Sequence, residues 1–146
     1  MQVKVEHLDG VKFTVAARGH VIVNDQPVED GGTDEGMTPP EMLLGSLASC
    51  AAYYAAYYLK ARKLATAGTE VIVTAEKLAN PSRIDHFKIE VVAPVALTPE
   101  QVEGIDRAVH RCIVHNTLLT IPTITTTVRG QIAAEMLAMH ERGHLA

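Results

Sequence analysis

The 146-residue chain has no tryptophan, and its six aromatic residues are two phenylalanines and four tyrosines. It has only two cysteines and no basic excess, because 13 lysines and arginines face 17 acidic residues for a net charge of −4. General nucleic-acid binding needs a positively charged surface. We therefore expect no nucleic-acid partner and look for function in the rare residue types instead.

We also expect no secretion signal in the opening segment, since MQVKVEHLDGVKF alternates charged and apolar residues. We expect a cytoplasmic protein in a reducing compartment. Residues 42–59 carry no charge, and a run of that length approaches what is needed to cross a bilayer. Because this run contains glycine, serines and many alanines, we interpret it as the buried helix of a globular fold and expect no membrane partner.

The order of predicted elements indicates an α+β fold. Alternating apolar residues, β-branched runs and the Asp9-Gly10 turn signal predict strands at residues 2–6, 11–17, 20–24, 69–78, 86–94 and 121–128. Thr-Pro capping signals predict long helices at residues 38–64 and 98–115, and a terminal helix follows Gly130. The resulting order, βββ-α-ββ-α-β-α, predicts helices packed against a sheet. We expect one domain over 1–146, with 129–146 as terminal helix and tail.

The two cysteines lie on the apolar faces of the two long predicted helices. Cys50 follows Leu47 at helical spacing, and Cys112 follows Val109. Unpaired cysteine is among the most buried residue types, so each can be an ordinary core residue. If the two faces meet, the thiols could instead form a redox pair. A disulfide needs Cα atoms about 4.4–6.8 Å apart, which requires a tight helix crossing.

A working thiol must ionise, and Cys50 lies too far along its helix to benefit from the N-terminal dipole. It therefore needs a cationic neighbour. The candidates by sequence are Arg18, Arg111 and His115. Glu41 completes a capping box with Thr38, and it could also orient an arginine beside Cys50. Direct contact is excluded in a straight helix, because nine residues span about 13.5 Å.

The histidines raise the question of a metal site. His110 and His115 flank Cys112, and His140 and His144 have helical spacing. Structural zinc sites use four ligands in recognisable pairs, and neither CxxC nor HExxH occurs here. The chain also has no P-loop, no GxGxxG motif and no GxSxG motif. We expect no metal, no nucleotide and no serine-hydrolase chemistry.

Three segments together resemble the OsmC/Ohr superfamily of peroxide-defence proteins. They are RGHVIVNDQPVEDGG, TPPEMLLGSLASC and RCIVHNTL, and the resemblance spans roughly residues 11 to 128. The RGH and VHNTL details are similar to the OsmC-like branch. The resemblance implies an OsmC-like fold with strands wrapped around two long central helices, in an intertwined homodimer with active sites at the subunit interface.

The resemblance also implies a thiol peroxidase without a metal or bound organic cofactor. Cys50 would attack a hydroperoxide and become a sulfenic acid, and Cys112 would condense with it to a disulfide. An external dithiol would then reduce that bond. The family's arginine–glutamate pair, which lowers the thiol pKa, is best matched by Arg18 and Glu41. Two alternatives stay open: a binding protein for an apolar or reactive small molecule, and a purely structural role for both thiols.

Overall fold

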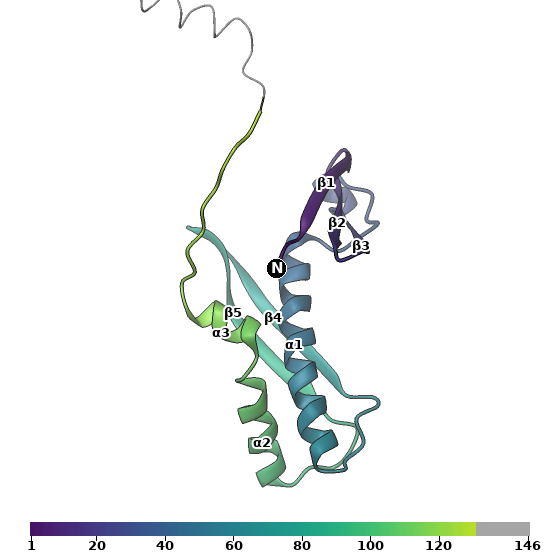
Figure 1. Cartoon of the computed structure of the whole chain (residues 1–146), viewed down its shortest axis with the longest axis vertical. Coiled ribbons are helices and arrows are strands. Elements are labelled where there is room, and N and C mark those ends of the chain that lie inside the picture. Colours follow the sequence, from purple (N-terminus) through teal and green to yellow (C-terminus); the bar gives the residue numbers. More distant parts are fainter. Residues whose placement is uncertain (131–146) are drawn as a thin grey trace, which may run out of the picture.

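The computed structural model describes residues 1–130 and confirms an α+β fold (Figure 1). Its elements are β1 (Lys4–Asp9), β2 (Lys12–Ala17), β3 (His20–Asn24), the 3₁₀ turn η1 (Val28–Asp30), α1 (Pro39–Ala61), β4 (Glu70–Ala79), β5 (Ser82–Val92), α2 (Pro99–Val109) and α3 (Ile113–Leu119). Within residues 1–130, none of the helices has the length and apolarity required to cross a membrane.

The strands form two separate antiparallel sheets. The first has the order β1-β2-β3, with Val15 of β2 paired to Val5 and Ile22 on either side. The second is the long hairpin of β4 and β5, in which Val73 pairs with Ile89. Figure 1 shows the β4–β5 hairpin alongside α1, whereas the three-stranded sheet stands beyond the N-terminal end of this helix. Of the two sheets, therefore, only the hairpin packs around the middle of α1 in the described part of the chain.

The loop between β3 and α1 is organised around one buried carboxylate. Asp25 is fully buried and accepts hydrogen bonds from the amides of Gln26, Thr33 and Glu35 and from the Thr33 hydroxyl. Burial alone would raise the pKa of Asp25, but these donors outweigh it and hold the pKa well below its ordinary value. Lys12 of β2 forms an ion pair with Glu35 at 2.6 Å, which ties the loop to the first sheet.

Both long helices begin with the capping boxes that the sequence predicts. Thr38 and Glu41 exchange hydrogen bonds at the start of α1, and Thr98 and Gln101 do so at the start of α2. The core lies where these helices cross over the β4–β5 hairpin. Its buried members are Ala51, Ala55, Tyr58, Leu59, Ile105 and Val109. Partly buried residues of the hairpin, such as Val71 and Ile89, pack against this cluster.

The prediction of one continuous helix over 98–115 is wrong. The helix α2 ends at Val109, and the amides of His110, Arg111 and Cys112 bond to carbonyls three or four residues earlier. Cys112 then has an extended backbone, with φ −61° and ψ 124°, and α3 begins at the next residue. The second cysteine therefore lies in the connection between two helices.

The predicted strand over 121–128 does not form within the described part of the chain. This segment has no paired strand, and Ile121, Ile124 and Val128 are 84% exposed or more. Figure 1 shows it running extended away from the rest of the fold. β-branched residues favour an extended backbone, but a strand also needs a neighbouring edge for its amides. The predicted terminal helix over 129–146 lies outside the described residues, apart from its first two positions.

The remaining boundaries are close to the predicted ones. The largest shift is at β5, which starts at Ser82 instead of at residue 86 because the turn with β4 is confined to Asn80 and Pro81. The Asp9-Gly10 turn between the first two strands is confirmed, and Gly10 has φ +52°. Glycine adopts this left-handed conformation without the steric cost that a side chain would add.

Candidate functional site

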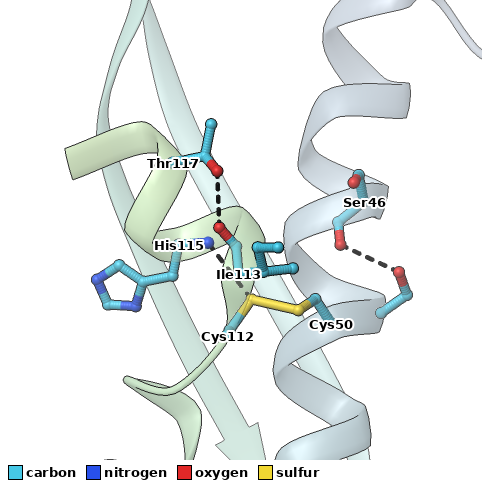
Figure 2. Close-up of a disulfide and its surroundings, with 7 residues drawn as sticks. Ser46, Cys50, Cys112, Ile113, His115 and Thr117 are labelled. Atoms are coloured by element: carbon cyan, nitrogen blue, oxygen red, sulfur yellow. Dashed lines mark hydrogen bonds between the residues drawn. A yellow bond between two sulfur atoms is a disulfide. The ribbon is translucent and has the colours of Figure 1, made fainter. Parts of the chain in front are cut away.

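The two cysteines of the chain are joined to each other. Cys50 of α1 and Cys112, which follows α2, form a disulfide with their Cα atoms 5.8 Å apart (Figure 2). The bond links positions 62 residues apart in the sequence. The expectation that the two cysteine-bearing segments meet is therefore confirmed, and neither thiol is an isolated core residue.

Small residues allow this close approach of α1 and α2. Ala51 and Ala55 present little bulk along the buried face of α1, and both are fully buried. Gly104 of α2 lies directly against Tyr58, so that a Cβ atom at position 104 would overlap the tyrosine ring and hydroxyl. Packed helix axes usually lie about 8–10 Å apart, and Cα atoms lie about 2.3 Å from each axis, so only facing positions come within disulfide range. Cys112 lies just beyond the end of α2 at Val109, with its Cα atom 5.8 Å from that of Cys50.

The two sulfurs have different surroundings. Cys112 is fully buried, and its Sγ accepts a hydrogen bond from the backbone amide of His115 at 3.3 Å (Figure 2). In this way the Cys112 side chain caps the start of α3. Cys50 is only partly buried and occupies the middle of α1. Of the two cysteines, only Cys50 has solvent-exposed surface in residues 1–130.

Glu41 lies at the start of α1, where its carboxylate accepts hydrogen bonds from the Thr38 amide at 2.7 Å and the Thr38 hydroxyl at 2.8 Å. These bonds, with a smaller contribution from the charge of Lys77, lower the pKa of Glu41. The capping interpretation is thus confirmed. Glu41 makes no hydrogen bond to Cys50 within residues 1–130, which agrees with the separation along the helix.

Arg18 is at the turn between β2 and β3, with a left-handed backbone at φ 53°. It is exposed and has no hydrogen bond or ion pair with any residue of the described part of the chain. The sheet that carries it stands beyond the end of α1, whereas Cys50 lies in the middle of this helix (Figure 1). The structure brings Cys50 and Cys112 together, but it does not join Arg18 or Glu41 to them.

A cavity of about 880 Å³ opens between α1, α2, α3 and β5. Most of its lining is apolar, including Leu47 and Ile105, and His110 and His115 contribute polar rings. The two imidazole centroids are 4.9 Å apart, and the Nδ1 atom of His115 is buried without a hydrogen-bond partner in residues 1–130. The sequence pattern suggested no such cavity, because its wall combines side chains from four elements.

Within residues 1–130, no cluster of three or more histidine, cysteine or acidic side chains is suited to hold a metal ion. His110 and His115 are near each other, but Cys112 is in the disulfide. The other candidate pair, His140 and His144, lies outside the described residues. The described site therefore consists of a cysteine pair and a nearby, mostly apolar cavity, which His115 lines but neither cysteine does.

Fold and site together define an α+β protein with a cysteine pair that joins α1 to the connection between α2 and α3. The family model described as OsmC-like protein matches residues 32–127. The chain belongs to the OsmC-like family, in agreement with the resemblance seen in the sequence. No curated protein sequence matches the chain.

Solved structures support the same fold. A protein described as a putative osmotic stress induced and detoxification response protein from Psychrobacter arcticus has a TM-score of 0.73 and 23% identity, over 80% of this chain and 87% of that one. An OsmC-like protein from Mycoplasma pneumoniae has a TM-score of 0.68 and 22% identity, over 82% and 87%.

A third structure, from Legionella pneumophila, is described as an organic hydroperoxide resistance protein OsmC, predicted redox protein and regulator of sulfide bond formation. Its TM-score is 0.55 with 17% identity, over 81% of this chain and 89% of that one. At identities this low, the three structures show that the fold is shared.

Proposed function

We propose that this protein is a cysteine-based peroxidase that reduces organic hydroperoxides, and hydrogen peroxide as a further substrate, in oxidative-stress defence. The Cys50 thiolate attacks the terminal peroxide oxygen, the O–O bond breaks, and an alcohol or water leaves. Cys50 becomes a sulfenic acid. The Cys112 thiolate then attacks the Cys50 sulfur, which releases hydroxide and forms the disulfide. An external dithiol restores both thiols by exchange.

The disulfide between Cys50 and Cys112 is the observation that carries this proposal. Peroxide must reach the first sulfur, and Cys50 is partly exposed. The second sulfur must wait within bonding distance, protected from oxidation, and Cys112 is fully buried. One accessible and one protected sulfur suit these two different roles. The Legionella neighbour, described as an organic hydroperoxide resistance protein, supports the same substrate class.

The proposal also includes a homodimer, because no cation of residues 1–130 bonds to the Cys50 sulfur. A second copy could bring its Arg18 to this Cys50, where a guanidinium would favour the thiolate. Glu41 would orient that arginine through the carboxylate oxygen that does not bond to Thr38. We place the protein in the cytoplasm, where cellular dithiols can keep both cysteines reduced between turnovers.

Peroxide consumption by purified protein tests the proposal. Wild type, with tert-butyl hydroperoxide and excess dithiothreitol, is expected to consume peroxide catalytically. Cys50→Ser should fall to the rate of the dithiol alone. Cys112→Ser should keep the first reaction but slow or alter the recycling. Equal peroxide consumption by wild type and Cys50→Ser would overturn the proposal.

A binding protein without turnover is the second candidate, and the apolar cavity of about 880 Å³ favours it. Cavities of this size suit drug-sized apolar molecules. The two functions are separated by native mass spectrometry of the protein as purified, alongside the peroxide assay. A retained small molecule together with no peroxide consumption would support the binding function, whereas turnover without a retained molecule would support the peroxidase.

A further inference from the structure

The two sulfurs of the disulfide are not equally open to a reducing thiol. An attacking thiolate approaches along the S–S axis, from the side opposite to the sulfur that leaves. Attack on Cys112 Sγ would therefore have to come through the interior, where Cys112 has no exposed surface. Cys50, by contrast, keeps part of its surface exposed, so Cys50 Sγ is the sulfur of the pair that an external thiolate has a route to.

The buried sulfur is also the one that has a hydrogen-bond donor. The backbone amide of His115 points at Cys112 Sγ from 3.3 Å (Figure 2). A hydrogen bond to an ionised acceptor is stronger than one to a neutral acceptor, so the bond gains strength when Cys112 becomes a thiolate. Because a thiol with a lower pKa leaves faster, this amide favours Cys112 as the leaving group.

From these two observations we infer that an external dithiol reduces the protein by attacking Cys50 Sγ, with Cys112 as the leaving thiolate on the His115 amide. The reductant sulfur bonds to Cys50, the bond between the two cysteines breaks, and its electron pair goes to Cys112. The second thiol of the reductant then attacks the sulfur attached to Cys50. Cys50 leaves as a thiolate, the reductant becomes a cyclic disulfide, and two electrons have entered the protein. This inference rests on the proposed function, in which the disulfide is reduced in every cycle.

One effect opposes this direction of attack, because burial in apolar surroundings disfavours a thiolate at Cys112. By that effect alone, Cys50 would be the better leaving group. Steric access outweighs this effect of burial, because an external thiolate that cannot reach Cys112 Sγ cannot attack it. The His115 amide then offsets part of the cost of a buried thiolate, without needing a charged side chain.

Trapping the mixed disulfide tests the direction of attack. The full chain is oxidised with diamide instead of peroxide, and intact mass confirms the loss of two hydrogens. Excess 2-mercaptoethanol is then added for the shortest practical intervals before acid quenching, digestion with pepsin and mass spectrometry. We expect the adduct on the Cys50 peptide in roughly tenfold or greater excess over the Cys112 peptide. Equal labelling, or labelling mainly on Cys112, would overturn the inference.

Two variants at position 115 distinguish the role of the backbone amide from that of the imidazole side chain. His115→Pro removes the N–H donor, whereas His115→Ala keeps it and serves as the matched control. Pro is tolerated in the first turn of a helix, where position 115 lies. We expect His115→Pro to be reduced by the thiol about three to ten times more slowly than His115→Ala, with a higher pKa for the Cys112 thiol. Equal reduction rates and equal Cys112 pKa values in the two variants would show that the His115 amide does not assist the leaving thiolate.

The result of the trapping experiment does not depend on whether the protein reacts with peroxide. If the mixed disulfide forms on Cys50 while peroxide is not consumed, the direction of attack holds and the proposed substrate is wrong. If peroxide is consumed while the adduct forms on Cys112, the peroxidase holds and the direction of attack is wrong. Failure of diamide to join the two cysteines would overturn both.

Discussion

Cys50 and Cys112 form one disulfide, yet they differ in exposure, backbone conformation and hydrogen bonding. Cys50 lies within a helix and is partly exposed. Cys112 is buried in the connection between two helices, and its Sγ accepts a hydrogen bond from the His115 amide. A thiol that meets peroxide must be reachable and ionised, and a thiol that closes the disulfide must be close and protected. The individual surroundings of the two residues therefore fit different steps of one reaction.

The pKa of the Cys50 thiol is expected to depend on Arg18 and Glu41. In a Cys112→Ser background, the rate of alkylation by iodoacetamide against pH should give a pKa below the ordinary value of about 8.5. Arg18→Ala should return it towards that value, because a nearby cation would be lost. Glu41→Gln should do so in part while α1 stays capped, since Gln101 fills the same position in the second capping box.

Arg83→Ala is the matched control, because Arg83 is an arginine of β5 already paired with Asp85 at 2.7 Å. It should leave the Cys50 pKa unchanged. If Arg18→Ala also leaves it unchanged, another group activates Cys50 and the match of Arg18 to the family arginine is wrong.

Asp25 is expected to make stability depend on pH. Its pKa is lowered in the folded protein, so its contribution is complete above the ordinary value of 3.8 and is lost as the pH falls towards the folded value. At neutral pH, Asp25→Asn should lower the midpoint of thermal unfolding by about 5 °C or more. The difference between wild type and Asp25→Asn should shrink as the pH falls below 3.8.

Melting curves of both proteins from neutral pH to pH 3 check this prediction. The control is Asp30→Asn, which changes an exposed aspartate of the same loop. A wild-type advantage over Asp25→Asn that is constant across this pH range would show that the carboxylate charge of Asp25 does not anchor the loop.

At the scale of elements, the crossing of α1 and α2 depends on a position without a side chain. Gly104→Ala places a methyl group where Tyr58 already lies. Overpacking costs about 1–3 kcal/mol, and the better helix propensity of alanine returns up to about 1 kcal/mol. We expect a net loss of stability and slower disulfide formation with diamide, because the helices must move apart.

Gly45→Ala in α1 is the matched control, since a Cβ there meets no atom within 4 Å. It should stabilise the protein by about 0.5–1 kcal/mol through helix propensity. Urea unfolding of both variants measures the two effects. A Gly104→Ala protein that is as stable as Gly45→Ala would contradict the tight packing at Tyr58.

The elements that could be predicted from sequence are those decided by local chemistry. The Thr38 and Thr98 capping boxes fix the starts of both long helices within a few residues, and the Asp9-Gly10 signal fixes the first hairpin. The break before Cys112 could not be predicted, because cysteine is not among the preferred capping residues. The thiol becomes a cap only once the tertiary fold holds it beside the His115 amide.

Two further features depend on more than local sequence. The segment over 121–128 has the composition of a strand, but pairing requires a sheet edge beside it, and this segment runs away from both sheets of the described chain (Figure 1). The helical spacing of the apolar residues predicts that the Cys50 and Cys112 segments meet, although Cys112 itself lies in the connection after α2. The position of Arg18 relative to Cys50 depends on how whole sheets are arranged. Sequence motifs therefore identify the sulfurs better than the group that would activate them.

At the scale of the whole molecule, the three-stranded sheet is not covered by the rest of the described chain. Apolar residues on both of its faces are exposed, with Val21 at 61% and Ile22 at 46%. A small sheet needs a packed face for stability. We expect a homodimer in which a second copy covers this sheet, with a mass by light scattering of twice the 15.8 kDa chain.

Val21→Lys should weaken this dimer, because a buried charge without a partner is costly. Val28→Lys, which changes an exposed valine outside the sheet, is the control. Light scattering across micromolar concentrations measures both variants. A wild-type protein that stays monomeric over this range would contradict the dimer and remove the second copy as the source of Arg18.

The most direct test of the account is the mass of the intact protein after one equivalent of hydroperoxide. The reduced wild type should lose two hydrogen atoms as Cys50 and Cys112 join. Cys112→Ser should instead gain one oxygen that dimedone captures on Cys50, and Cys50→Ser should keep its mass. A wild-type chain whose mass stays unchanged under these conditions would contradict the central claim that its two sulfurs carry out peroxide chemistry.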